Sequence, residues 1–400
     1  MATRSTSHDV IITGAGPAGL SLAASLAAHG LDIGLIERQP ESTLAEPEFD
    51  GREIALTHHS IKLLSALGAW PHIPEAEISP LGEAQVRNGA STHALRFNPH
   101  SMQAPLGQLV PNHQIRRALF AAVRPLANIH LRAATAATGI ATDQDSATLT
   151  LASGERLSAQ LIVAADTRFS EMRRRMGITA RMRDFGKTMM VCRMSHEQSH
   201  QNIATEWFGF GQTIAILPLN GTPEKPHISS LVLTLPACHA ERLMNLDPEA
   251  FSAEMTQRYE RRLGDMRLLS TRHAYPLVGV YAGRFTAKRF ALVGDAAVGM
   301  HPVTAHGFNF GLSGQKTLAT LIGKATVAGQ NIASPTLLKT YESQHRRATL
   351  PLYLATNATA LLYTDDRRPA RILRDAVIRT GEQIPLLRHA ITAGLMAGGR

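Results

Sequence analysis

The sequence predicts a mixed α/β protein, α+β overall, that combines a parallel-sheet lobe, a mostly antiparallel sheet lobe and a helical C-terminal tail. Strand-like runs alternate with helical runs up to about residue 69, and four strand-like runs follow one another between residues 188 and 235. From residue 313 onward the chain reads as helical. A length of 400 residues leaves room for two lobes with sizeable cores.

The composition excludes several classes of protein. With 44% hydrophobic and 18% charged residues, the chain is expected to be globular rather than disordered or embedded in a membrane. Its two cysteines, Cys192 and Cys238, are too few for a disulfide framework or a four-ligand zinc site, and they indicate a reducing compartment. Glycines and a proline interrupt the apolar run 10–28, so it does not read as a signal peptide, and we expect a cytoplasmic protein.

The chain carries an excess of basic residues. Its formal charge of +9 comes from 34 Arg and 7 Lys against 32 acidic residues, whereas aromatic residues make up only 5%. Proteins that stack nucleic-acid bases usually place aromatic side chains among their basic ones, so we expect no nucleic-acid partner. Anionic phosphates, an acidic membrane surface and a merely solvated basic surface stay open as explanations.

The first element is a strand that ends in a glycine-rich loop. The β-branched run 10–13 suits a buried parallel strand, and the pattern G-x-G-x-x-G follows at once. In such a loop the first glycine permits a tight turn, the second lets the backbone approach a pyrophosphate, and the third lets the next helix lie close to the strand. The loop predicts a dinucleotide site, and its residues are Gly14, Ala15, Gly16, Pro17, Ala18 and Gly19.

A helix and a second strand follow this loop. The helix is expected over residues 18–29, with Gly30 just after its end, and its N-terminus directs free N–H groups at a phosphate. The second strand covers residues 32–36 and ends at Glu37. This glutamate lies 23 residues after Gly14, close to the spacing of about 20 at which an acidic side chain accepts ribose hydroxyls. These features do not distinguish NAD from FAD.

A second ligand-facing pattern lies near residue 290. The strand-like run 289–293 ends in Gly294-Asp295, and His301-Pro302 then precedes Gly307-Phe308-Asn309 at the start of a helical stretch. A carboxylate at a strand end, a proline and a glycine-rich helix start indicate a second contact with a ligand at the same sheet edge. An NAD dehydrogenase does not need this contact, whereas a cofactor with a polyol chain and a tricyclic ring does.

Three stretches of the chain, 10–38, 161–173 and 290–312, resemble the fingerprints of FAD-dependent aromatic ring hydroxylases, the single-component flavoprotein monooxygenases. The resemblance spans nearly the whole chain. It implies a Rossmann-like FAD-binding lobe, FAD as the cofactor and NAD(P)H as the co-substrate. It also implies that one oxygen atom of O2 is transferred to an aromatic small molecule through a C4a-hydroperoxyflavin.

The resemblance implies roles for individual residues as well. The glycine loop and the segment around Glu37 hold the ADP half of FAD, Asn112 lies against the pyrophosphate, and Asp295 bonds the ribityl chain. The expected catalytic residues are Pro302, beside the reactive edge of the flavin, and Arg52, near the flavin ring. The backbone at residues 307–309 lines the ring. The expected cofactor-binding residues are Gly14, Gly16, Pro17, Ala18, Gly19, Glu37, Arg38, Arg52, Asn112, Asp166, Asp295, Gly307, Phe308 and Asn309.

The chain departs from the family pattern at several positions. The middle fingerprint usually reads Asp-Gly-x-x-Ser-x-x-Arg, but Thr167 stands in place of the glycine after Asp166. In the family this segment contacts both FAD and the nicotinamide nucleotide, so the substitution bears on the pyridine-nucleotide contact. In the third fingerprint, Ser313-Gly314 replaces a common Arg-Asp pair and Val298 replaces a common histidine.

Within the family, the chain is most similar to the ring hydroxylases of ubiquinone biosynthesis. Trp70, the step Tyr275-Pro276-Leu277 and the pair His301-Pro302 carry this likeness, and the segments 166–170 and 299–304 resemble demethoxyubiquinol hydroxylases. The likeness implies a polyprenyl phenol or quinone precursor as the substrate. Two alternatives stay open: a flavin-dependent reductase of prenyl double bonds, and a non-catalytic flavin-bound protein of a quinone-biosynthesis assembly.

Three further clusters of ionisable residues have less specific explanations. The segment 196–200 fits the zinc-protease pattern H-E-x-x-H, but it is polar all round and a strand-like run follows it, so we expect a loop and no metal site. His58-His59 is expected to be a helix-surface pair. The arginines at 173–175, 181 and 183 either bind an NADPH phosphate or form a solvated basic face.

Both ends of the sequence contribute to the predicted cofactor site, so the FAD-binding domain is expected to be discontinuous. We expect it to comprise residues 1–75, 100–185 and 280–340. The substrate-binding sheet domain is expected to comprise residues 76–99 and 186–279, and a helical segment residues 341–400.

The last segment is basic, with nine Arg, no Lys and five acidic residues. Apolar positions lie beside several of these arginines. They predict either a helix packed on the core with a solvated basic side, or a lip that contacts the inner membrane peripherally or a quinone-biosynthesis assembly. The arginines in question are Arg367, Arg368, Arg371 and Arg374.

Overall fold

The computed structural model describes residues 6–364, apart from residues 90, 92, 99–104, 210 and 302–306, and it also describes residue 374. Helices and strands are intermixed along these residues, and the strands form one sheet with a parallel centre and two that are mostly or wholly antiparallel. The predicted fold class is therefore confirmed.

Five parallel strands form the centre of the first sheet, in the order β19-β11-β1-β2-β8. The apolar run 10–12 is fully buried there because parallel strands are covered on both faces. Three short antiparallel strands extend this sheet beside β19 and β11. Its members are β1 (Thr6–Thr13), β2 (Ile33–Ile36), β8 (Ile129–Arg132), β9 (Ala137–Thr142), β10 (Ala147–Leu151), β11 (Arg156–Ala164), β18 (Thr286–Ala287) and β19 (Phe290–Leu292).

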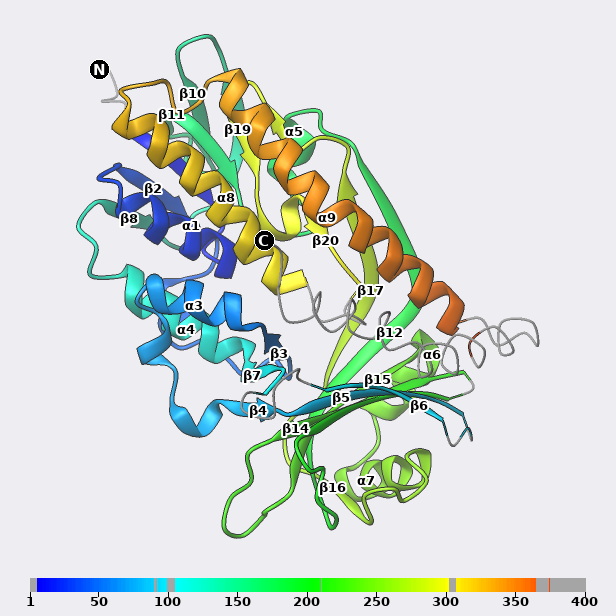
Figure 1. Cartoon of the computed structure of the whole chain (residues 1–400). Helices are drawn as coiled ribbons and strands as arrows, with labels where there is room; N and C mark the ends of the chain where they lie inside the picture. Colours follow the sequence, from blue (N-terminus) through cyan, green and yellow to red (C-terminus); the bar gives the residue numbers. More distant parts are fainter. Residues whose placement is uncertain are drawn as a thin grey trace.

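Helices from distant parts of the chain cover this sheet. Helix α1 (Pro17–Ala27) contacts both α4 (Asn112–Val123) and α8 (Gly307–Val327), and α8 contacts α9 (Pro335–Thr364). Figure 1 shows α8 beside α1, with α9 running next to α8 toward the second sheet. The shorter helices are α2 (Glu41–Ala45), α3 (His58–Ala66) and α5 (Glu171–Arg175).

The second sheet has the order β20-β17-β12-β15-β14-β13-β5-β6, with β16 beside β12, and all its pairs are antiparallel except β5 with β13. Helices α6 (Ala237–Met244) and α7 (Pro248–Arg258) cover one of its faces. Its strands are β5 (Glu83–Asn88), β6 (Ala94–Phe97), β12 (Ala180–His196), β13 (Ile203–Phe208), β14 (Thr213–Leu219), β15 (Ile228–Pro236), β16 (Met266–Leu268), β17 (His273–Ala282) and β20 (Val298–Gly299). A small antiparallel sheet of β3 (Glu53–Leu56), β7 (Gly107–Pro111) and β4 (Ser79–Leu81) contacts β14.

Two long strands, β12 and β17, connect the two lobes. Their pairing shifts register between Asp184 and Thr188, where Gly186 has a φ of +64°. On one side of the shift, Ala180 pairs with Ala282 near the first sheet, and on the other side the strands belong to the centre of the second sheet. Figure 1 shows both strands running from one lobe into the other. The second sheet is thus held in a fixed position relative to the first.

The predicted elements agree with the structure most closely where the hydrophobic pattern is regular. The runs 203–208 and 213–219 are strands with the predicted bounds, whereas the run 189–194 is only the inner part of the 17-residue strand β12. Residues 181–184 of β12 are exposed and mostly polar, so the strand lacks the apolar signal there. The first helix ends at Ala27 rather than residue 29. The expected domain boundaries at 185 and 340 fall inside β12 and α9, and the division into domains stays a prediction.

Helix α9 is fastened to the first lobe by polar contacts. The buried Tyr341 hydroxyl donates to the carbonyl oxygen of Leu292 at 2.7 Å, where β19 ends. Further along the helix, Arg346 donates to the carbonyl oxygen of Gly283 at 2.9 Å and lies over the ring of Tyr281. The helical C-terminal segment expected from residue 341 begins six residues earlier, at Pro335. These contacts make its first half part of the core.

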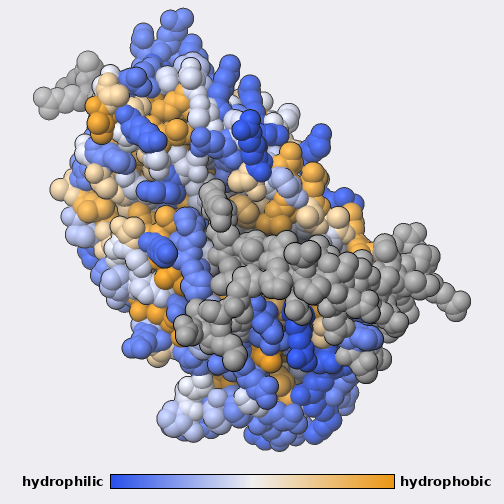
Figure 2. Space-filling view, in the orientation of Figure 1, coloured by the Kyte–Doolittle hydropathy of each residue, from blue (hydrophilic) through white to orange (hydrophobic). Residues whose placement is uncertain are grey.

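The outer face of α9 exposes apolar side chains. Leu350, Leu354 and Leu361 are 37%, 55% and 38% exposed, and they recur at helical spacing on one side of α9. Figure 2 shows hydrophobic residues along the line of this helix. Among the described residues, no helix is both long and apolar enough to cross a membrane.

We expect the Tyr341→Phe variant to lose about 1 to 2 kcal/mol of the free energy of unfolding, because the buried carbonyl of Leu292 loses its donor. Urea denaturation followed by circular dichroism measures this free energy. Tyr353→Phe is the matched control: Tyr353 lies in the same helix and is buried, but its hydroxyl makes no hydrogen bond to a described residue. Equal losses in the two variants would contradict this account of how α9 is held.

Candidate active site

Three glycines with different surroundings shape the loop between β1 and α1. Gly14 has a φ of +103°, and a Cβ at this position would lie 2.6 Å from the carbonyl oxygen of Ala165. A Cβ at Gly19 would lie 1.9 Å from the carbonyl oxygen of Gly14. A Cβ at Gly16, in contrast, would meet no atom of the described residues within 4 Å. Packing therefore requires the first and third glycines, whereas the second lies open at the N-terminus of α1.

Glu37 lies beside this loop, as its spacing from Gly14 predicts. The strand β2 ends at residue 36, and one carboxylate oxygen of Glu37 accepts a hydrogen bond from the Ala15 N–H at 2.7 Å. The other oxygen accepts from the Gln39 N–H at 2.9 Å. Arg38 is exposed next to it. The parallel pairing of β1 with β2 brings the loop and the carboxylate to the same edge of the sheet.

Asp166 follows β11 at the same edge. One of its carboxylate oxygens is buried and has no hydrogen-bond partner among the described residues, and the other accepts from the Glu171 N–H at 3.1 Å. Burial raises the pKa of Asp166 above its ordinary value. A Cβ at Gly14 would lie 2.9 Å from the Asp166 Cα, so this carboxyl is adjacent to the glycine loop. Asp166 thus offers an unused acceptor next to the loop.

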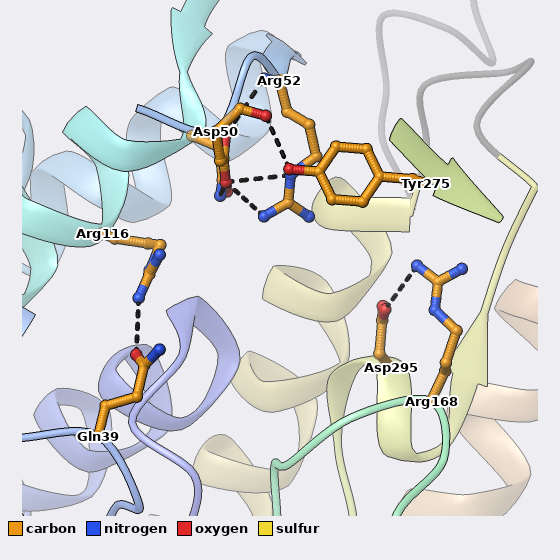
Figure 3. A network of polar contacts seen from close by, with 8 residues as sticks. Gln39, Asp50, Arg52, Arg116, Arg168, Tyr275 and Asp295 are labelled. Carbon is orange, nitrogen blue, oxygen red and sulfur yellow. Dashed lines mark hydrogen bonds and ion pairs between the residues drawn. The ribbon is translucent and has the colours of Figure 1, made fainter. Parts of the chain in front are cut away.

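Asp295 lies in the turn that follows β19, the strand beside β11 in the sheet. Gly294 has a φ of +59°, and a Cβ there would lie 2.7 Å from the Cβ of Ala18, so this turn packs against the start of α1. The Asp295 carboxylate accepts from Arg168 at 3.3 Å and is 43% exposed (Figure 3). Arg168 also donates to the carbonyl oxygen of Val278 on β17.

Arg52 is held by a network from three parts of the chain. Its guanidinium donates to the Asp50 carboxylate at 2.5 Å and lies over the ring of Tyr275. The Tyr275 hydroxyl donates to the Asp50 carbonyl oxygen at 2.8 Å, and the Asn112 amide donates to the Asp50 carboxylate at 2.7 Å. Burial alone would raise the pKa of Asp50, but the charge and hydrogen bonds of Arg52 lower it overall. Asp50 therefore stays ionised and fixes the position of Arg52.

Arg116 completes one side of the site. It lies one helical turn after Asn112 on α4 and donates to the Gln39 side chain at 3.1 Å. Burial lowers the pKa of Arg116 without removing its charge. In Figure 3, the pair Arg116 and Gln39 lies opposite Asp295, with Arg52 between them, and these side chains surround a common region.

The start of α8 forms the last described wall of the site. The buried Asn309 side chain accepts from the Thr57 N–H at 3.3 Å and donates to the Ala55 carbonyl oxygen at 2.9 Å. These bonds tie α8 to the connection between β3 and α3, beside Arg52. Gly307 and Phe308 precede Asn309 at the helix start. Pro302, the other expected catalytic residue, lies outside the described residues.

These groups fit an elongated cofactor that carries a diphosphate. The open side of Gly16 at the N-terminus of α1 suits a phosphate, and the first turn of that helix contains no acidic residue. Two arginines, Arg52 and Arg116, supply positive charge, and the oxygen of Asp166 that lacks a partner among the described residues offers an acceptor for a hydroxyl group. A family model described as "FAD binding domain" matches residues 7–351.

The chain belongs to the FAD binding domain family. The FAD cofactor that the sequence predicts is therefore confirmed.

Curated relatives of this FAD-binding chain share most of its length. It is 46% identical to the ubiquinone hydroxylase UbiM of Neisseria meningitidis over 393 residues. This alignment covers 97% of this chain and 84% of that protein. It is 34% identical to the ubiquinone hydroxylase UbiL of Rhodospirillum rubrum, over 96% of this chain and 89% of that protein. The predicted resemblance to FAD-dependent hydroxylases of ubiquinone biosynthesis is confirmed.

A solved structure shows the same fold. P. aeruginosa PqsL in complex with 2-aminobenzoylacetate matches with a TM-score of 0.77 at 21% identity, over 92% of this chain and 100% of that one. At this identity the likeness concerns the fold alone.

The structure of this FAD-binding chain brings most of the predicted residues together. The glycine loop, Glu37, Asp166 and Asp295 lie at one edge of the parallel sheet, and Arg52 and Asn112 face this edge across the site. Their individual roles stay predictions. Sequence reasoning missed Arg116 and Arg168. Arg116 lies one turn after Asn112 on a helix, and Arg168 lies inside the middle fingerprint. The sequence positions of both residues therefore could have indicated that they lie at the site.

A buried charged cluster links the site to the second sheet. Arg193 on β12 donates to Glu53 on β3 at 2.9 Å and to Glu77 at 3.0 Å. The Glu53 side chain is fully buried, and burial raises its pKa to about 7 although Arg193 opposes the shift. This cluster fixes the distance between β3, which follows Arg52, and the second sheet.

Two other sequence patterns are resolved by their contacts. In the segment 196–200, His196 is the last residue of β12 and residues 197–200 form the expected loop. The His196 ring bonds to the Gln198 carbonyl and the Ser229 hydroxyl, and the His200 ring bonds to the Leu219 carbonyl. The expectation for Arg173 is wrong: this side chain is buried and donates to the carbonyl oxygens of two residues, Arg168 and Ala296, so it does not face a passing nucleotide.

We expect the Gly16→Ala variant to raise the FAD dissociation constant about 10-fold or more while the FAD-free protein keeps its Tm, because the added Cβ enters open space and contacts no atom in the part of the chain that the structure describes. Gly19→Ala is expected to lose both FAD and stability, since its Cβ overlaps the Gly14 carbonyl oxygen. The flavin-to-protein absorbance ratio and thermal unfolding measure the two effects. Wild-type FAD affinity in Gly16→Ala would refute the assignment.

Glu53 is expected to make the free energy of unfolding fall as the pH rises from about 4.5 to 7. Its pKa in the folded chain lies above the ordinary value of 4.5, so the folded state binds the proton more tightly than the unfolded state. Glu53→Gln removes this fall, which is of the order of 3 kcal/mol at most. Urea denaturation between pH 5 and 8 tests this. Glu77→Gln, which alters the other carboxylate bound to Arg193, is expected to keep the fall.

Proposed function

We propose that this chain is a monooxygenase that uses FAD and NAD(P)H to hydroxylate the ring of a polyprenyl phenol or quinone precursor in ubiquinone biosynthesis. The observation that carries the proposal is the 46% identity to a protein named ubiquinone hydroxylase over 97% of the chain. The grouping of the FAD-fingerprint residues at one sheet edge supports it.

The reaction balances with one ring and one O2. A ring C–H bond is replaced by C–OH, the second oxygen atom leaves as water, and NAD(P)H with one proton supplies the two electrons. FAD, when bound, supplies the redox chemistry that passes these electrons to oxygen. The protein contributes binding, orientation and the exclusion of water.

Residues of this chain divide the work of binding between the two halves of FAD. The glycine loop and Glu37 hold the ADP half, and Arg116 and Asn112 flank the diphosphate. Asp295 holds the ribityl chain, and its ion pair with Arg168 orients the carboxylate. The backbone of residues 307–309, anchored through Asn309, would line the ring. Pro302, which lies outside the described residues, is the residue that the resemblance predicts for the reactive edge of the ring.

Arg52 lies at the end of the site that the flavin ring would occupy. Asp50 and Tyr275 immobilise its guanidinium, so it presents a fixed positive charge without reorganisation. The second sheet contacts Arg52, since the ring of Tyr275 on β17 lies against its guanidinium. The face of that sheet forms the substrate side, and apolar side chains of β12, β15 and β17 exclude water there: Met189, Val191, Val232 and Leu277.

Contact with a membrane surface is part of the proposal. The exposed apolar stripe of Leu350, Leu354 and Leu361 on α9 supports a chain at the cytoplasmic side of the inner membrane that admits a polyprenyl substrate. The four arginines near the C-terminus are expected either on a solvated basic side of a helix or in a lip at the membrane. Arg374 is wholly buried, so both alternatives are wrong for it. The other three, Arg367, Arg368 and Arg371, lie outside the described residues.

Purified FAD-loaded protein tests the proposal with NAD(P)H, O2 and a demethoxyubiquinol analogue that has a short prenyl chain. We expect the analogue to stimulate NAD(P)H oxidation and to gain one oxygen atom on the ring, as measured by mass spectrometry. A product reduced in the prenyl chain would identify a reductase instead. Absence of stimulation by any quinone precursor would leave a non-catalytic flavin-bound protein.

A further inference from the structure

Glu206 lies on the face of the second sheet that is turned away from α6 and α7. Its neighbour on β13, Trp207, is buried in the core that those two helices cover. Successive side chains of a strand point to opposite faces, so Glu206 points to the other face. In Figure 1, α7 lies on one side of this sheet and the FAD-binding lobe on the other.

The strand register places Glu206 in a row of cross-strand neighbours that ends at the loop containing Arg52. Glu206 on β13 pairs with Ala215 on β14. Ala215 pairs in turn with Val232 on β15, and Val232 pairs with Val191 on β12. The Val191 side chain would be 2.6 Å from a Cβ at Gly51, so this end of the row touches the loop. Neighbouring strands are about 4.8 Å apart, which puts Glu206 about 14 Å from Val191 on the same face.

Among the described residues of the sheet, the nearest neighbours of the Glu206 carboxyl on this face are apolar. Along β13 they are Ala204 and Phe208, and on the flanking strands they are Ala215 and Val86. In the described part of the chain the partly buried carboxyl has no hydrogen-bond or ionic partner. A polar group in such surroundings destabilises the fold, and ligand sites commonly contain a few polar groups of this kind in an apolar wall.

The protonation of Glu206 follows from the same surroundings. Burial raises its pKa to about 8 and is the single cause of the shift. On this face, the charged or titratable side chains that the register places are Lys187 and Arg193 on β12, three strands away, and His273 and Tyr275 on β17, four strands away. The flanking strands β14 and β5 present uncharged residues there: Thr213, Ala215, Leu217, Ala84, Val86 and Asn88. At neutral pH the carboxyl therefore keeps its proton and offers one donor and one acceptor.

We propose that Glu206 binds an oxygen substituent of the aromatic ring, with its O–H donating to a hydroxyl or methoxy oxygen and its C=O accepting from a hydroxyl. The inference rests on the proposed function and adds a substrate requirement to it. The ring must carry an oxygen on the edge turned toward β13, so Glu206 is a substrate-binding residue that selects which ring carbon meets the flavin.

Two substitutions at this position separate hydrogen bonding from charge. Glu206→Gln keeps one donor and one acceptor, whereas Glu206→Leu keeps the approximate volume and removes both. The dissociation constant for the demethoxyubiquinol analogue is measured from the change in flavin absorbance on binding, and KM and kcat are measured with NAD(P)H, all between pH 6 and 9.5.

We expect Glu206→Leu to raise the dissociation constant and KM about 10-fold at neutral pH, with unchanged FAD content. Glu206→Gln is expected to bind nearly as the wild type does. Wild-type binding is expected to weaken above about pH 8, where the carboxyl loses the donated proton, and Glu206→Gln is expected to lack this dependence. The matched control is Glu83→Gln, because Glu83 on β5 lies on the opposite face, beside Arg96.

The outcomes distinguish the inference from the proposed function. If the wild type hydroxylates the analogue but Glu206→Leu binds it with unchanged affinity, the role of Glu206 is refuted and the proposed function stands. The same holds if Glu206→Gln retains the wild-type pH dependence of binding. If the wild type neither binds nor hydroxylates any ring precursor, both are refuted.

Discussion

The close packing of glycine-containing backbone at the carboxyl edge of the parallel sheet is the constraint on which the rest of the site depends. No Cβ fits between Gly19 and the Gly14 carbonyl, and one at Gly294 would crowd Ala18. Because of these contacts, α1 lies directly on the loop after β1, and the turn after β19 lies directly on α1. Segments nearly 280 residues apart in the sequence therefore present their polar groups to the same ligand, and Glu37 and Asp295 reach it from strands on either side of β1.

A second constraint fixes the substrate side relative to this edge. The strands β12 and β17 continue from one lobe into the other, so the second sheet does not depend on a flexible linker for its position. Tyr275 and Arg193 then fasten the face of that sheet to the segment around Arg52 through hydrogen bonds and buried ion pairs. A buried ion pair contributes little net stability, but it disfavours other arrangements of the two lobes. Orientation of a ring over a flavin needs this kind of fixed geometry.

The sequence predicts the FAD side of the site well because its signals are local. A glycine loop after a β-branched strand, an acid at the end of the next strand and Gly-Asp after a third each depend on a few adjacent residues, and parallel topology brings all of them to one edge. The contacts made by Asn112 with Asp50 and by Arg116 with Gln39 depend on how α4 docks. The isolation of Glu206 depends on the register of β13 with β14 and β5, which hydrophobic alternation does not specify. The burial of Arg173 and Arg374 likewise follows from tertiary packing, so a basic run alone misplaces them at the surface.

Incorporation of isotopically labelled oxygen tests the central claim most directly. Turnover of a demethoxyubiquinol analogue by the FAD-loaded protein under ¹⁸O2 in ordinary water, with the product examined by mass spectrometry, shows where the new oxygen comes from. The account predicts one ¹⁸O atom on the ring of each product molecule and the other in water. A product that contains oxygen from the solvent, or that gains hydrogen on its side chain and no oxygen, would contradict it.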